Sequence, residues 1–260
     1  MKKTLIALAV AASATVSGSA MAWTANGVGG SVDFSGTLNP KNLVTPWEVK
    51  VGDTVNDLNA LIKKGQSKVD IVAKKSILAL GIRTATNKAF LGQPGIAPQI
   101  DFKNAVDLNG FEGGVTTLTL DVKSGTTNDK IGTLTAPFNA AAVLSVTNTP
   151  DTKDIYAYVF NGASGFTGGL STDWTKVNKN PQTALNTLSA DIMANFDDQN
   201  LSFTSSGMAS GFNTTGARYS AVYGAGILSN DVIKINLDNP VTADDEIIWK
   251  AELPITVSYQ

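Results

Sequence analysis

Carboxylates are the side chains of this 260-residue chain that could do acid–base chemistry. Asp197-Asp198 and Asp244-Asp245-Glu246 set acids side by side, and paired acids hydrolyse glycosidic bonds. Adjacent acids on polar, turn-like segments are far more often solvated loop ends, so catalysis is the weaker interpretation. The absence of His and Cys excludes the usual zinc sites, His-dependent nucleophiles and redox thiols. We therefore predict no enzyme, no catalytic residue, no metal site and no cofactor.

Sugar binding is the second chemistry that the side chains indicate, between residues 147 and 216. An aromatic ring stacks on the apolar face of a sugar, while amides and charges nearby satisfy its hydroxyls. The candidates for a receptor-binding surface are Tyr156, Tyr158, Asp173, Trp174, Lys176, Asn178 and Lys179. In the opposing interpretation the two tyrosines belong to a core strand and Trp174 anchors this segment.

The elements that must position these residues are short strands. Most are β-branched or aromatic runs bounded by Gly, Asn, Asp or Pro, and Asn109-Gly110 and Asn161-Gly162 indicate tight turns. Strands at this spacing predict a β-sandwich. The runs are 47–51, 69–72, 76–82, 99–102, 115–122, 141–146, 155–160, 219–223 and 232–237.

Two segments have helical spacing instead. Val55, Leu58, Leu61 and Ile62 predict a short helix that ends at Gly65. A second helix is expected after Asn180 as N-cap and Pro181 at the first position, with one apolar stripe. The stripe comprises Leu185, Leu188, Ile192, Met193 and Phe196. Together with the Gly-, Ser- and Asn-rich stretch 161–175, this region predicts a large insertion between sandwich strands, at about 147–216.

The first 22 residues have the pattern of a secretory signal peptide. Lys2 and Lys3 precede an apolar run, and Ala20-Met21-Ala22 is a small-residue cleavage signature. The net charge is −2 for the whole chain and falls further without the two lysines. This balance gives no basic footprint for nucleic acid or an anionic membrane. We predict an exported protein with neutral or soluble partners.

An apolar arm follows, at residues 23–40. The residues Val28, Gly30, Val32, Phe34, Gly36 and Leu38 recur at every second position, and small or polar residues lie between them. This alternation predicts one strand with an apolar side and a polar side. Such a strand pairs within its own domain or is donated to a neighbouring subunit.

The other end of the chain alternates in the same way. Leu253, Ile255, Val257 and Tyr259 are separated by polar residues and by Pro254, which cannot donate a ladder hydrogen bond and suits an edge strand. An unpaired apolar arm and an apolar edge strand together predict a fold that lacks one of its own strands. Such a subunit would polymerise head to tail.

The arm Gly29–Leu38 resembles the donor strand of chaperone–usher pilins, with Gly36 at the glycine of that pattern. The wider resemblance is to the FaeG-like major fimbrial subunits. It rests on Pro46–Gly52, Lys75–Leu78, Gly95–Ile100, Tyr219–Ile227, and Trp249 with the final alternating residues. It lapses between residues 147 and 216, and the absence of Cys agrees with this branch.

The resemblance implies an incomplete immunoglobulin-like β-sandwich at residues 41–260, completed by a donor strand and carrying a helix-containing insertion. It also implies assembly with identical subunits, a periplasmic chaperone and an outer-membrane usher, and a final location in a fimbrium on the cell surface. Adhesion to host glycans through the insertion is the further expectation. The alternatives are a shaft pilin without adhesive activity and a secreted monomeric carbohydrate-binding module.

Overall fold

The computed structural model divides the chain into two compact units, Met1–Lys41 and Asn42–Gln260. In the described residues no helix is long and apolar enough to cross a membrane. The structure describes residues 25, 26, 28, 32, 34–38, 44–150, 153–162 and 165–260.

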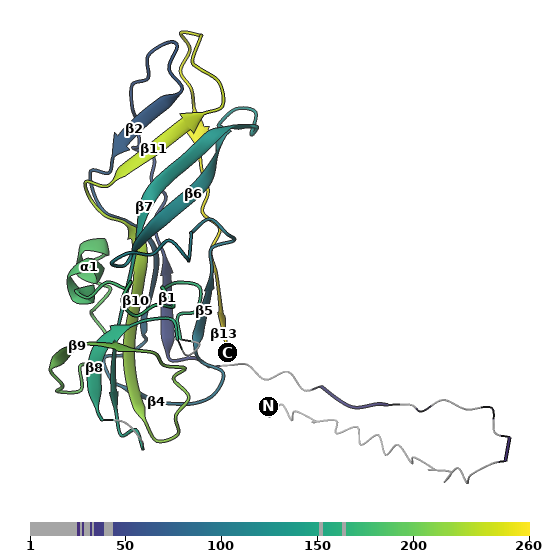
Figure 1. The fold of residues 1–260 in the computed structure, drawn as a ribbon, viewed down its shortest axis with the longest axis vertical. Helices are drawn as coiled ribbons and strands as arrows, with labels where there is room; N and C mark the ends of the chain where they lie inside the picture. Colours follow the sequence, from purple (N-terminus) through teal and green to yellow (C-terminus); the bar gives the residue numbers. More distant parts are fainter. Residues whose placement is uncertain are drawn as a thin grey trace, which may run out of the picture. The chain divides into compact units, whose positions relative to one another are not determined.

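The larger unit is built almost wholly from antiparallel strands, as Figure 1 shows. The strands in chain order are β1 (Trp47–Val51), β2 (Lys68–Val72), β3 (Ile77–Thr84), β4 (Phe90–Leu91), β5 (Pro98–Asp101), β6 (Val115–Ser124), β7 (Lys130–Thr147), β8 (Ile155–Val159), β9 (Phe203–Met208), β10 (Arg218–Ile227), β11 (Val232–Leu237), β12 (Trp249–Lys250) and β13 (Thr256–Tyr259). The one helix of the described residues is α1 (Pro181–Leu188). This architecture confirms the all-β, immunoglobulin-like fold class.

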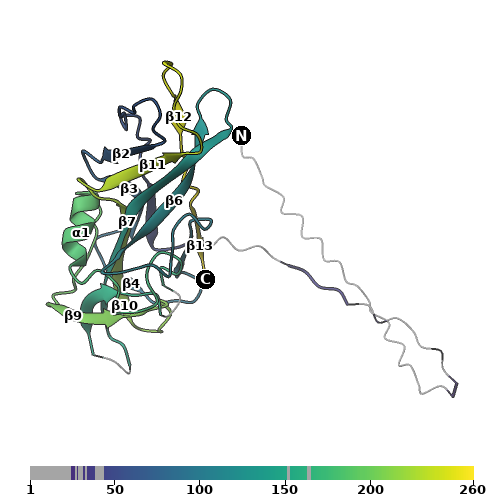
Figure 2. The same cartoon turned by 45° about the horizontal axis from the view of Figure 1, so that its top comes forward.

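Strand β7 is the long central strand of the larger sheet. Its first half pairs with β6 and β11 and its second half with β10 and β8, within the order β1-β3-β10-β7-β11-β2. Pairing with β11 ends at Thr135 and pairing with β10 begins at Asn139. Pro137, which has no N–H, lies between them, where no described strand pairs with that side of β7. Figure 2 shows β6, β7, β11 and β2 side by side.

The core between the layers is apolar and rich in aromatic rings. Trp47 makes edge-to-face contacts with Phe90, Phe166 and Phe212, at centroid separations of 5.1, 5.9 and 5.0 Å. Tyr223 is fully buried, and its hydroxyl donates to the carbonyl oxygen of Gly169 at 3.1 Å. A core of this size lets a chain without disulfides fold stably.

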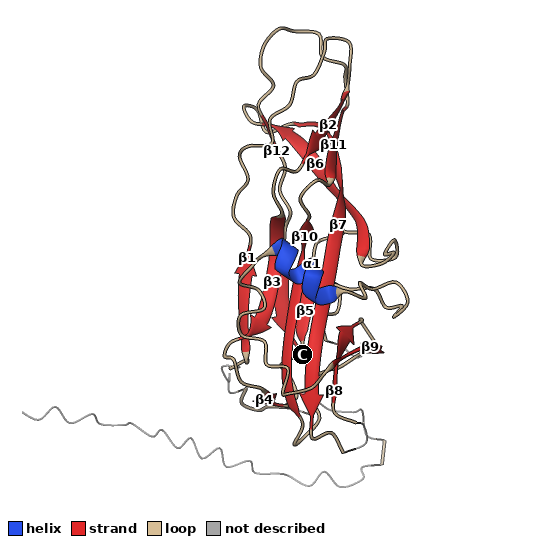
Figure 3. Ribbon diagram, turned by 90° about the vertical axis from the view of Figure 1, so that its left-hand side faces the viewer, coloured by secondary structure: helices blue, strands red, loops and turns tan. Residues whose placement is uncertain are grey.

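Residues 148–217 connect neighbouring ends of β7 and β10, because Thr147 lies opposite Arg218, and they carry β8 and β9, which extend the sheet beside β7. This segment is called the insertion below. Its helix α1 packs on the outer face of β7 and β10, as Figure 3 shows, and buries Leu185 and Leu188 there.

The helix expected near residues 53–64 is wrong. That segment has no regular secondary structure, and Leu61 is fully exposed. Leu58 packs against the core from an extended chain, so apolar positions three apart need no helix here. Gly65, with φ of +81°, lies in the turn before β2.

The second expected helix exists but is shorter. It begins at Pro181 as predicted and ends at Leu188, and residues 190–195 are turns. Asn180 makes no side-chain cap bond; instead its own N–H donates to Asn178 Oδ1 at 2.8 Å. Ile192 is nevertheless buried with Leu185, so the apolar stripe packs on the sheet beyond the helix end.

Candidate functional site

The first candidate site is the uncovered apolar side of β1. In its antiparallel pair with β3, Val49 lies opposite Ile82 and Val51 opposite Leu80, so their side chains share one face of the sheet. Ile82 and Leu80 are fully buried, whereas Val49 and Val51 are 41% and 60% exposed. Among the described residues, β3 is the only strand that pairs with β1. The core-facing side of β1 therefore lacks a covering element.

Strand β13 shows the same deficiency. It pairs with β5 alone among the described strands, and Val257 lies opposite the buried Ile100. Burial alternates from Ala251 to Gln260 between half-buried and exposed residues. The residues of the predicted edge strand, Leu253, Ile255, Val257 and Tyr259, are the half-buried ones and pack against the core.

These two edges converge at residues 96 and 97. The indole Nε1 of Trp47 donates to the carbonyl oxygen of Ile96 at 2.7 Å. Ala97 and Gln260 exchange two backbone hydrogen bonds of 3.0 and 3.1 Å. The start of β1 and the end of β13 are thus joined through one short segment. We call β1 and residues 251–259 the acceptor edges.

The smaller unit contains the predicted arm. In its described residues no strand is present, and the large apolar side chains Val28, Val32, Phe34 and Leu38 are exposed. Gly36 has no neighbouring atom within 4 Å of the position that a Cβ would take. Gly30 lies outside the described residues.

The receptor candidates do not gather on one surface. Tyr158 is 1% exposed and Tyr156 is buried in β8, where its hydroxyl accepts a hydrogen bond from Gln182 Nε2 at 3.1 Å. Burial raises the pKa of Tyr156 above its ordinary value. Tyr156 packs against Phe196 and Phe203 and Tyr158 is almost fully buried, so neither ring offers a face for stacking on a sugar.

Trp174 is the exposed aromatic residue among the candidates. The residue is 52% exposed, and Lys179 Nζ lies 5.6 Å from the centroid of its ring. Asp173 Oδ1 accepts from the N–H and hydroxyl of Thr175 at 2.8 and 2.7 Å, which lowers the pKa of Asp173. Trp174 and Lys179 therefore form one exposed pair, and Asp173 stabilises the turn beside them.

Lys176 and Asn178 are the two remaining candidates, and both contact structure outside this pair. Lys176 Nζ forms an ion pair of 2.8 Å with Glu112, and the Lys176 carbonyl accepts from Gly114 N–H at 2.7 Å. Asn178 accepts the N–H of Asn180. Sequence reasoning missed Glu112, because no local signal connects it to a residue 64 positions away.

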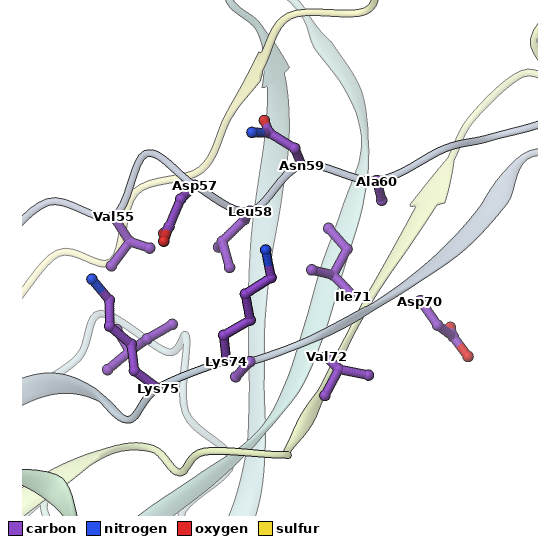
Figure 4. Close-up of a pocket in the computed structure, with 12 residues that line it drawn as sticks. Val55, Asp57, Leu58, Asn59, Ala60, Asp70, Ile71, Val72, Lys74 and Lys75 are labelled. Carbon is purple, nitrogen blue, oxygen red and sulfur yellow. The ribbon is translucent and has the colours of Figure 1, made fainter.

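The paired acids have structural contacts. Asp197 accepts backbone N–H groups of Ala89 and Gln199, at 3.2 and 2.8 Å, and Asp244 pairs with Lys64 at 2.5 Å. In the part of the chain that the structure describes, no three acidic side chains lie close enough together to hold a metal ion. A cavity of about 230 Å³ lies beside β2, and Figure 4 shows Lys74 and Lys75 lining it together with Asp57 and Asp70.

Comparison with known proteins gives one consistent result. Residues 1–260 match the K88 fimbrial family, described as "Fimbrial, major and minor subunit". The chain is 28% identical to the F41 fimbrial protein of Escherichia coli and 30% identical to the K88 fimbrial proteins AB and AD of the same species. Each alignment covers 100% of both chains.

Proposed function

The chain belongs to the K88 family of fimbrial subunits, and from this premise we propose that it polymerises by donor-strand exchange. A fimbrial subunit is exported and ends at the cell surface within a fimbrium. In the proposed reaction, residues 23–40 of one subunit add a strand between the acceptor edges of the next. The contact is head to tail, so it does not close and generates a filament.

The observation that carries this proposal is the exposure of core-facing valines on β1. Val49 and Val51 share a face with fully buried residues of β3, yet nothing described covers them. An added strand would cover such side chains and satisfy open backbone groups, and apolar burial stabilises by about 25 cal/mol per Å². The arm offers matching chemistry through its alternating apolar residues.

A periplasmic chaperone and an outer-membrane usher complete the proposed pathway. Exposed apolar edges favour aggregation, so a subunit waiting for assembly needs a temporary strand from another protein. The usher would then present the next subunit, whose arm replaces that strand.

The test is deletion of residues 23–38 in cells that also supply chaperone and usher. We expect a soluble subunit that copurifies with the chaperone and forms no fibres, because the acceptor edges remain and the donor is gone. Adding back a synthetic peptide of residues 23–38 should displace the chaperone without restoring fibres. Polymer ladders from the deleted protein on native gels would refute the mechanism.

We also propose that the subunit is an adhesin, with Trp174 and Lys179 at the receptor surface. This proposal is supported by an exposed ring beside an ammonium group, a combination that can stack on a sugar and bond its hydroxyls. The alternatives remain a subunit that only builds the shaft and a monomeric carbohydrate-binding module. A glycan array probed with assembled fibres tests the adhesin proposal.

A further inference from the structure

Beyond Trp47, strand β1 has little apolar contact to hold it in place. It is five residues long, and Trp47 is its only buried residue. Val49 and Val51 are incompletely covered, and the far edge of the strand has no described partner. Short edge strands with few buried contacts open locally at low free energy. Trp47 and the ladder to β3 anchor the start of the strand, and a further contact supports residues 48–51 while their apolar side is uncovered.

That contact lies on the opposite face of β1. Glu48 faces outward beside its cross-strand neighbour Arg83 of β3, whose Nε donates to Glu48 Oε2 at 2.8 Å. Nη1 of the same guanidinium donates to the backbone oxygen of Asp191 in the insertion at 2.6 Å. Arg83 therefore ties β1 and the insertion together through one planar group.

Two weaker contacts follow the same route. Asn195 Nδ2 lies 3.4 Å from Glu48 Oε2 and donates to the Ala85 oxygen at 3.2 Å. Lys50, the next outward residue of β1, pairs with Asp191 Oδ2 at 3.2 Å, although both side chains are more than half exposed. Residues 191–195 thus contact both outward side chains of β1.

The insertion is itself fixed where it makes these contacts. Ile192 packs over Gly81 of β3 and Gly224 of β10, which lie opposite each other. A Cβ on Gly224 would lie 2.6 Å from Ile192 Cδ1, so the pair of glycines lets the insertion approach the sheet closely. Ile192 is buried with Leu185 and Val222. Residues 191–195 are therefore a firm support for β1.

We infer that Arg83, acting with residues 191–195, is a positioning residue for strand acceptance: it holds β1 in register so that its open edge can pair with an incoming arm. The inference rests on the proposed donor-strand exchange. If β1 is correctly placed for only a fraction of the time, the apparent affinity for the incoming arm is reduced by that fraction. Through this support of β1, the insertion would take part in assembly as well as in any receptor binding.

The test compares Arg83→Met with wild type, Arg83→Lys and Lys130→Met in the full chain. Lys130→Met is the matched control, because it removes an ion pair of 2.6 Å with Asp121 at a distant site. Backbone hydrogen exchange at residues 48–51 is read from the amides of Glu48 and Lys50, which alternate with the open edge and face β3. It is compared with exchange at β10, with and without a synthetic peptide of residues 23–38. The dissociation rate of that peptide is measured in parallel.

We expect Arg83→Met to speed backbone hydrogen exchange at residues 48–51 by about tenfold, because the charge-assisted hydrogen bonds of the guanidinium are lost. The exchange rate in β10 should stay unchanged. The dissociation rate of the peptide should rise several-fold. Both rates in Arg83→Lys should lie between those of wild type and Arg83→Met, since lysine keeps the charge but lacks the planar guanidinium. Lys130→Met should match wild type.

The inference is overturned if exchange at residues 48–51 is unchanged, if it rises equally in β10, or if it rises with no effect on peptide dissociation. Failure of the wild-type chain to bind the peptide at all would instead refute donor-strand exchange. In that case exchange at residues 48–51 still reports whether Arg83 holds β1.

Discussion

Val51 and Leu80 lie opposite each other across β1 and β3, yet Leu80 is fully buried and Val51 is 60% exposed. The difference comes from the edge position of β1, because Leu80 lies one strand further into the sheet. A strand added beyond β1 would give Val51 the cover that Leu80 already has.

Val51→Thr should therefore lower the free energy of unfolding only when the acceptor edges are filled. Thr replaces a methyl with a hydroxyl that would be buried by the arm, at a cost of about 1 kcal/mol. Denaturant unfolding of the subunit with and without the peptide of residues 23–38 measures this. Val72→Thr is the control, because Val72 is 53% exposed on β2 and next to the buried Ile71. Equal effects of the two substitutions would place Val51 outside the contact.

Gly36→Phe should block fibre formation. If Gly36 faces a crowded part of the acceptor edges, a large side chain overpacks it at a cost of roughly 1–3 kcal/mol or more. The subunit should still fold and bind chaperone, since Gly36 has open space around it in the unpaired arm. Thr37→Phe puts the same ring on the other side of the arm, so this variant should form more fibres than Gly36→Phe. Normal fibre yield from Gly36→Phe, counted by electron microscopy, would show that the register is different.

Trp174→Ala should weaken adhesion of intact fibres several-fold, because many weak sites act together along one fibre. Lys179→Met should have a smaller effect of the same sign. Binding to host epithelial cells is measured with fibre number and length matched by microscopy. Leu91→Ala, at an exposed apolar residue of β4, serves as control. Unchanged adhesion would remove Trp174 from the receptor surface.

Tyr223→Phe should destabilise the subunit by about 1–3 kcal/mol, because the carbonyl of Gly169 loses its donor in a buried place. Burial also raises the pKa of Tyr223 well above its ordinary value. The unfolded chain then releases this proton at a lower pH than the folded one, so wild type loses stability as pH rises above about 10. The stability gap between wild type and variant should narrow there. A constant gap up to pH 11 in thermal melts would contradict this account.

Sequence reasoning placed most strands because alternation and β-branched residues mark them directly. The run 115–122 is observed as Val115–Ser124, and 232–237 agrees with β11. It missed the first half of β7, where Gly132 and Pro137 interrupt the pattern, and β9, which is rich in Ser. Both strands depend on neighbours that no local signal reveals.

The candidate site was predicted unevenly for a similar reason. Alternation along the chain is visible in the sequence, and it predicts the half-buried residues Leu253, Ile255, Val257 and Tyr259. Val49 and Val51 also alternate with polar residues, but their exposure arises because no described strand lies beyond β1. The support of β1 by Arg83 and Asp191 joins residues 108 positions apart, so only the folded chain displays it.

The continuous strand β7 has a consequence for how the subunit unfolds. Its first half pairs with β6 and β11 and its second half with β10 and β8. The two ends of the sheet therefore share one backbone, so unfolding of one end should unfold the other in a single cooperative transition. In a chain with no cysteine, the main chain itself serves as the crosslink.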